Sequence, residues 1–236
     1  MKRNFLVVLA VILLLVITGC SYVKEEKVNV NRFKEEYESV NGTKIGDTEL
    51  VHRDVEIPDD HPFVYKRAND IITMMDNGET FVVYFGFAEC PWCRSVLPTL
   101  IEVADELGVK EIFYVDVSEI RDKYSINDDG DVVLVKEGSE GYIGLLNRLD
   151  EVLDDYTLTD EDDKEIEVGE KRIYAPNVVS IVAGKAKKLE TGISDMQDDA
   201  FMELTDDMKK DTYNKFKCAL KCVLENKNAC SSKNAC

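Results

Sequence analysis

The tetrapeptide Cys-Pro-Trp-Cys at residues 90–93 constrains the fold of this chain more than any other feature. It follows an unbroken apolar run at 81–87, which predicts a buried strand, and it precedes a helical pattern at 94–107. Two thiols therefore stand where a buried strand ends and a helix begins. The unpaired N–H groups and the dipole of a helix N-terminus favour a thiolate. The position predicts an exposed, ionisable Cys90 and, one turn later, a more buried Cys93.

Residues 1–20 have the features of an export signal. A short basic head, Met1–Asn4, precedes a continuous apolar run, Phe5–Ile17. The run is shorter than the ~20 apolar residues of a membrane span and suits the hydrophobic part of a signal peptide. The segment Ile17–Cys20 resembles a bacterial lipoprotein signal, which implies lipidation of Cys20. An uncleaved anchor is the alternative, and both readings place the body of the protein at the cell membrane on its extracytoplasmic side.

Charge and histidine content exclude several classes of protein. The formal net charge of −18 argues against binding nucleic acid or an anionic membrane through charge, because both need a basic surface. The only histidines, His52 and His61, precede the predicted core, which excludes histidine-based triads and zinc-hydrolase motifs. The segment 127–131 has some calcium-loop residues, but Ser125 and Lys136 are wrong at the first and twelfth positions of such a loop. A turn is predicted there.

The order of predicted elements indicates an α/β domain between a tether and a cysteine-rich tail. We expect a flexible tether at 21–47 with a short helix through Asn31–Ser39, the domain at 48–205, and a C-terminal helix and tail at 206–236. Alternating strands and helices imply parallel strand pairing in the first half of the domain. The predicted strands are 49–57, 81–87, 111–117, 175–182 and 185–190, with a hairpin at 157–174; the predicted helices are 65–75, 94–107, 141–156 and 206–226.

Four cysteines gather at the C-terminus, and an exported chain would hold them as disulfides. Cys218 and Cys222 are four residues apart on the last predicted helix, on the side opposite its apolar face. Their Cβ atoms would lie ~5–6 Å apart there, beyond the ~4 Å that a disulfide needs. We therefore expect each to pair with one of Cys230 and Cys236. A second redox centre that relays electrons to the Cys-Pro-Trp-Cys pair is the alternative.

The order of these elements resembles the thioredoxin superfamily: a strand, two thiols, a helix with Pro98 inside it and, later, a proline-led strand at Ala175–Pro176. The resemblance is greatest to membrane-anchored, thioredoxin-like lipoproteins of bacteria and covers about residues 62–192. It implies a central sheet flanked by helices, with a helix-plus-hairpin insertion at about 119–172 before the strand that follows Pro176. It further implies that Cys90 attacks, that Cys93 resolves, and that Pro176 is a cis-proline facing the pair.

The same resemblance implies a substrate surface around the thiols. Pro91, Trp92, Ala175 and Pro176 would contact an extended substrate peptide, which would pair with the backbone beside Pro176 by strand addition. Trp92 is expected to be exposed. Glu89 would oppose ionisation of the neighbouring Cys90, because its carboxylate disfavours a second negative charge.

Two departures from the family pattern bear on function. One is the stretch between Val117 and Pro176, which is several times the usual length and would either bind a partner or cover a sheet edge. The other concerns a buried acid. Ordinary thioredoxins carry a buried aspartate six residues before the first cysteine, where this chain has Tyr84. A phenol with a pKa of ~10 is a poor proton shuttle near neutrality. Pro91 is similar to the first inner residue of glutaredoxins and periplasmic thiol oxidases, whereas Glu89 favours a reductant. The direction of electron transfer therefore stays open.

The leading hypothesis is an extracytoplasmic thiol–disulfide oxidoreductase that needs no cofactor and no metal. Its expected partners are exported cysteine-containing proteins and a membrane redox partner that resets Cys90 and Cys93, with the membrane itself contacted through the N-terminal lipid. A thioredoxin-fold binding or adaptor lipoprotein is the second hypothesis, motivated by the missing acid and the insertion. A third is a protein that handles a soft ion such as Cu(I) through the two thiols.

Overall fold

The computed structural model describes residues 32–225, which form a mixed α/β fold around one five-stranded sheet. The strand order is β1-β3-β2-β8-β9, with β1 and β2 both parallel to the β3 between them. β8 runs antiparallel to β2 and forms a hairpin with β9. The strands are β1 (Phe63–Tyr65), β2 (Phe81–Gly86), β3 (Ile112–Asp116), β8 (Asn177–Val182) and β9 (Lys185–Glu190). The predicted α/β class and its parallel pairing are confirmed.

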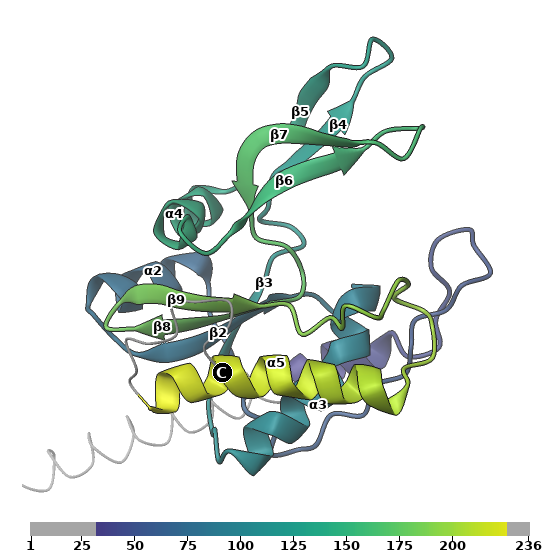
Figure 1. Cartoon of the computed structure of the whole chain (residues 1–236). Coiled ribbons are helices and arrows are strands. Elements are labelled where there is room, and N and C mark those ends of the chain that lie inside the picture. The colour runs from purple at the N-terminus through teal and green to yellow at the C-terminus, as the bar shows by residue number, and fades with distance from the viewer. Residues whose placement is uncertain (1–31, 226–236) are drawn as a thin grey trace, which may run out of the picture.

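Helices cover both faces of this sheet (Figure 1). Helices α3 (Pro91–Glu106) and α5 (Asp206–Leu224) pack on one face, together with the helical residues 32–39. Helices α2 (Ala68–Asp76) and α4 (Glu140–Leu149) pack on the other. Strand β2 is buried along its whole length, and its side chains alternate between the two cores because successive residues of a strand point to opposite faces.

The short helix expected near Asn31–Ser39 forms, but it is packed into the fold and is not part of a flexible tether; residues 21–31 of the predicted tether lie outside the described residues. Residues 32–39 are helical, and Phe33 and Tyr37 on that helix are fully buried. Phe33 stacks on Phe63 with 4.3 Å between ring centroids. The polar composition of this segment suggested a tether, but two aromatic side chains one helical turn apart give the helix an apolar face that packs on the core.

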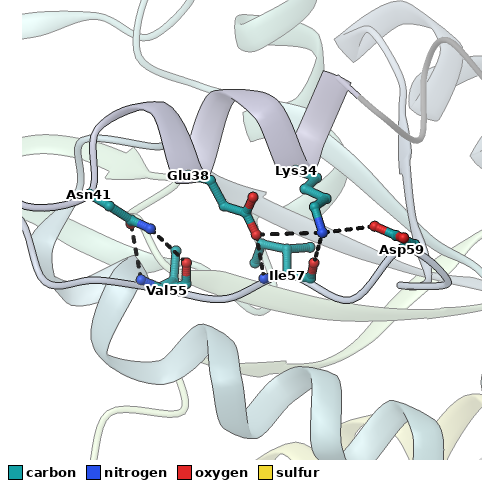
Figure 2. Close-up of polar contacts among 6 residues, drawn as sticks. All are labelled: Lys34, Glu38, Asn41, Val55, Ile57 and Asp59. Carbon is teal, nitrogen blue, oxygen red and sulfur yellow. Dashed lines mark hydrogen bonds and ion pairs between the residues drawn. The ribbon is translucent and has the colours of Figure 1, made fainter.

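The predicted strand at 49–57 does not form; the only pairing there is an isolated bridge between Lys44 and Val51. Figure 2 shows what replaces strand pairing: side chains of the N-terminal helix and of Asn41 bond the backbone of residues 55–57. Glu38 accepts from the Ile57 N–H at 2.9 Å, and Lys34 donates to the Ile57 carbonyl at 2.7 Å. The Asn41 amide both accepts from and donates to the backbone of Val55. These bonds satisfy backbone groups that a sheet would otherwise pair.

The insertion at about 119–172 contains more structure than predicted. Its helix α4 (Glu140–Leu149) begins where predicted but ends seven residues before the predicted end at 156. The predicted hairpin forms from β6 (Asp154–Thr159) and β7 (Glu165–Arg172), and β6 begins inside the predicted helix. A further hairpin of β4 (Lys123–Ile126) and β5 (Val132–Lys136) precedes α4. Both hairpins lie beyond α4, away from the main sheet (Figure 1). A buried ion pair of 2.8 Å between Arg172 and Asp122 joins the two ends of the insertion.

Helix α5 covers the sheet near the C-terminus of the described chain. The Thr205 hydroxyl accepts from the Met208 N–H and caps its start, as the preference of threonine for this position leads one to expect. Cys218 and Cys222 are both buried, so they do not lie on an exposed side of the helix. Cys218 is disulfide-bonded. Cys230 and Cys236 lie outside the described residues, so the predicted pairing stays a prediction.

The predicted signal segment, including Cys20, also lies outside the described residues. Within residues 32–225, no helix combines the length and the apolar character that crossing a membrane requires.

Candidate active site at the start of helix α3

The two thiols lie at the junction that the sequence predicts, where β2 ends and α3 begins. Cys90 is the N-cap of α3, and its sulfur accepts a hydrogen bond from the Cys93 N–H at 3.2 Å. Pro91 occupies the first helical position, where its missing N–H costs nothing and its fixed φ suits the helix. The helix therefore starts three residues earlier than predicted, and both cysteines belong to its first turn.

A second segment, distant in sequence, meets the thiols. The Cys90 thiol donates to the Ala175 carbonyl at 3.3 Å, and the Ala175–Pro176 peptide bond is cis, as the resemblance implies. Strand β8 begins immediately afterwards and pairs with β2, so the sheet itself brings Ala175 beside the cysteine pair. The structure thus gathers Cys90, Cys93, Ala175 and Pro176 at one end of the sheet.

Cys90 is 3% exposed, so the predicted exposed sulfur is wrong for this conformation. Its sulfur is enclosed between the first turn of α3 and the main chain at Ala175. Trp92, also expected to be exposed, is half-buried and packs against the core beneath α3. Pro91 and Ala175 are likewise half-buried, and Pro176 is buried. A partner can reach the sulfur only when this cover moves.

The surroundings of the two thiols shift their ionisation in opposite directions. The hydrogen bond from Cys93 is the main cause that lowers the pKa of Cys90, against the effect of burial; the N–H groups of Cys93 and Trp92 add to the lowering. Burial raises the pKa of Cys93 well above the ordinary range, and its bond to Cys90 raises it further. Cys90 therefore loses its proton first, which is the order that a nucleophile followed by a resolving thiol requires.

The charged group that acts on Cys90 is Arg121, which the sequence analysis did not single out. Its positive charge lowers the pKa of Cys90, and its guanidinium lies 4.9 Å from the centre of the Phe87 ring. Glu89, which we expected to oppose ionisation, is exposed and is not among the leading influences on that thiol. Arg121 belongs to the insertion, so the added segment contributes electrostatically to the site.

Two buried tyrosines stand behind Cys93. Tyr84 on β2 is fully buried, and its hydroxyl acts to lower the pKa of the Cys93 thiol against the larger effect of burial. The Tyr84 oxygen and the Cys93 sulfur lie 2.6 Å and 3.2 Å from the point that a Cβ on Gly86 would occupy. The Tyr37 hydroxyl, from the N-terminal helix, lies 3.1 Å from that of Tyr84. Tyr37 was missed because its segment was read as a tether; the helical spacing of Phe33, Tyr37 and Val40 is the signal that could have identified it.

Arg94, immediately after Cys93, is a fully buried cation that the sequence analysis placed merely on a helix. Its guanidinium donates to the carbonyls of Arg53 at 2.6 Å, and of Tyr37 and Ala88 at 2.9 Å, and it also bonds the Asn41 side chain. These bonds fasten the N-terminal segment to the first turn of α3. The position of Tyr37 behind the thiols depends on this anchor.

Residues 32–225 contain no group of three or more His, Cys, Asp or Glu side chains placed to hold a metal ion. Comparison with protein-family models and with curated proteins finds no match to the chain. The function is therefore argued from the geometry of the site.

Proposed function

We propose that the protein is a thiol–disulfide oxidoreductase with Cys90 as the attacking thiol and Cys93 as the resolving thiol. The observation that carries the proposal is the placement of the two thiols: Cys90 caps α3 and accepts from the Cys93 N–H at 3.2 Å, while Cys93 is fully buried behind it. Hydrogen bonding to Cys93 lowers the pKa of Cys90, and burial raises that of Cys93. A static structural pair has no need of a stabilised thiolate. The parallel β1-β3-β2 strands, the β8–β9 hairpin and the cis bond before β8 support a thioredoxin-like fold as part of the same proposal.

In the direction that reduces a substrate, the exchange has two steps. The Cys90 thiolate attacks one sulfur of a substrate disulfide, the S–S bond breaks, and the other substrate sulfur leaves as a thiolate that takes a proton from water. Cys93 then loses its proton and attacks the Cys90 sulfur, which releases the second substrate thiol and leaves a Cys90–Cys93 disulfide. Two electrons pass to the substrate. The same steps in reverse oxidise a dithiol.

A substrate must displace the cover of Cys90 before the first step. Because the Ala175 carbonyl accepts from the sulfur, an extended peptide that pairs with the backbone there would compete for the same edge. Half-buried Trp92 and Pro91 border this position. We propose exported cysteine-containing proteins as substrates, a membrane redox partner that resets the thiols, and a lipid anchor at Cys20 on the extracytoplasmic side.

Trapping tests the proposal. A Cys93→Ser variant cannot resolve the mixed disulfide, so it should accumulate reducible covalent adducts with cell-envelope proteins. Cys90→Ser is the matched control, since it removes the attacking thiol by the same substitution and should trap none. Equal trapping by the two variants, or no adduct with either, would refute the proposed exchange.

The burial of Cys90 favours a second function, a thioredoxin-fold binding or adaptor protein without turnover. A double variant, Cys90→Ser with Cys93→Ser, separates the two. An adaptor would keep its partner when both thiols are absent and would reduce or oxidise no model disulfide. An oxidoreductase would lose covalent capture and turnover together.

A further inference from the structure

The Tyr84 phenol and the resolving thiol of Cys93 approach the same point beside Gly86 on β2. Tyr84 and Gly86 point to the same face of the strand. A methyl group on the Gly86 Cα would lie 2.6 Å from the Tyr84 oxygen and 3.2 Å from the Cys93 sulfur. Both atoms therefore converge above a residue without a side chain, and the absence of a Cβ lets the phenol reach the thiol.

The second phenol completes a hydrogen-bond chain. The hydroxyls of Tyr37 and Tyr84 are 3.1 Å apart and both side chains are fully buried. Each hydroxyl has one proton to donate and lone pairs to accept. The chain can therefore run from Tyr37 through Tyr84 to the sulfur, or in the opposite direction, and both phenols stay partnered in either case.

We propose that Tyr84, oriented by Tyr37, donates a hydrogen bond to the Cys93 thiolate and thereby promotes the resolving step; this inference rests on the proposed function. When Cys93 is protonated, its S–H can donate to the Tyr84 oxygen, and the Tyr84 hydroxyl then donates to Tyr37. When Cys93 loses its proton, the hydrogen bonds reverse: Tyr37 donates to Tyr84, and Tyr84 donates to the sulfur. Tyr84 is then a catalytic residue, because it touches a reacting sulfur, and Tyr37 is a positioning residue supplied by the N-terminal helix.

The phenol acts as a donor and not as a base. Burial, followed by the nearby Cys93 charge, raises the pKa of Tyr84 well above the usual value for tyrosine. Burial likewise raises that of Tyr37. Both phenols keep their protons at neutral pH, so the proton of Cys93 leaves to the departing substrate thiolate or to water. Nothing in the step requires an acceptor inside the core.

The expected effect follows from the strength of one hydrogen bond to a charged acceptor. Removing it should lower the thiolate fraction of Cys93 about 10- to 100-fold. The thiolate of a less acidic thiol is a better nucleophile, and this offsets about half of the loss in rate on a logarithmic scale. The resolving step of a Tyr84→Phe variant should therefore be about 3- to 10-fold slower at pH 7, and its pH midpoint should move upward.

The experiment follows two phases of thiol release from the aromatic disulfide dithiobis-nitrobenzoate, added to the reduced full-length protein. The first phase is the attack by Cys90 and the second is resolution by Cys93. Tyr84→Phe should leave the first phase unchanged and slow the second, and Tyr37→Phe should slow the second by a smaller factor. Tyr142→Phe is the matched control, because it removes a fully buried phenol on the opposite face of the sheet, where it accepts from the Ile173 N–H.

The outcomes separate this inference from the function on which it rests. A second phase in Tyr84→Phe with the rate and pH midpoint of the unmodified protein would overturn the role of the phenol while leaving the oxidoreductase intact. Absence of the first phase in the unmodified protein would overturn the function itself. Should Tyr84→Phe fail to fold, Tyr37→Phe still tests the proposed hydrogen-bond chain: a slower second phase with a higher pH midpoint supports it, and an unchanged second phase overturns it.

Discussion

Replacing Arg94 by methionine should destabilise the protein more than any surface arginine replacement does. The guanidinium is fully buried, and burial lowers its pKa. It donates to three backbone carbonyls and to Asn41, and these acceptors come from the N-terminal segment and from the turn before α3. Methionine keeps an unbranched apolar stem but is shorter than arginine and supplies no donor. The acceptors would be left in the core without their charged partner.

The magnitude follows from these four bonds. At about 1 kcal/mol for each acceptor that loses its donor, the loss is about 4 kcal/mol. The variant no longer pays to desolvate a cation, which offsets part of this. We expect the free energy of unfolding to fall by about 2–4 kcal/mol. With a urea m-value of about 2 kcal/mol per M, the unfolding midpoint would drop by about 1–2 M.

Urea unfolding of the full-length protein, followed by circular dichroism, measures this loss. Arg148→Met is the matched control: Arg148 bonds Asp76 at 2.8 Å, but its side chain is 33% exposed, and such surface pairs contribute at most about 1 kcal/mol. If the midpoint of Arg94→Met lies within error of that of Arg148→Met, the guanidinium does not anchor the N-terminal segment and our account of this part of the fold is wrong.

Two further substitutions test the fold and the site. Gly192 has φ +71° and a Cβ there would lie 2.0 Å from the Phe216 ring, whereas Gly46 has φ +54° with nothing within 4 Å. Gly192→Ala should therefore lower the free energy of unfolding, measured by thermal unfolding, by about 2 kcal/mol more than Gly46→Ala does. Equal losses of stability would contradict the tight packing of α5. Replacing Cys93 by alanine removes the main cause that lowers the pKa of Cys90; the pH midpoint for alkylation of Cys90 should rise, and an unchanged midpoint would show that the helix N-terminus alone sets it.

Local pattern was sufficient to predict the elements that carry the thiols. The apolar run of β2, the periodicity of α3 and the proline-led strand β8 follow from period and turn chemistry within short windows. The hairpin of β4 and β5 was missed because its residues are mostly exposed, so neither strand has the alternation that a buried face produces. A two-stranded hairpin that buries neither face produces no regular alternation of apolar and polar residues from which it could be predicted.

What the sequence could not predict depends on contacts between distant segments. Cys90 is covered by a carbonyl 85 residues away, and no local pattern reports that closure. Tyr37 reaches Tyr84 from a segment whose polar composition resembles a tether. Arg94 looks like an ordinary helical arginine until its acceptors, Arg53 among them, are placed around it. Each of these three contacts joins segments that are distant in the sequence, so local composition could not predict it.

The central claim, that Cys90 is a stabilised thiolate which becomes reachable when its cover at Ala175 moves, is tested most directly by the pH dependence of its alkylation. The reduced full-length protein would be treated with iodoacetamide under native conditions, with Cys90→Ser to identify the sulfur that reacts. Our account predicts modification of Cys90 with a midpoint below the ordinary thiol value of ~8.5 and below that of the same protein unfolded in urea. Modification that requires urea, or a native midpoint at or above the unfolded one, would contradict it.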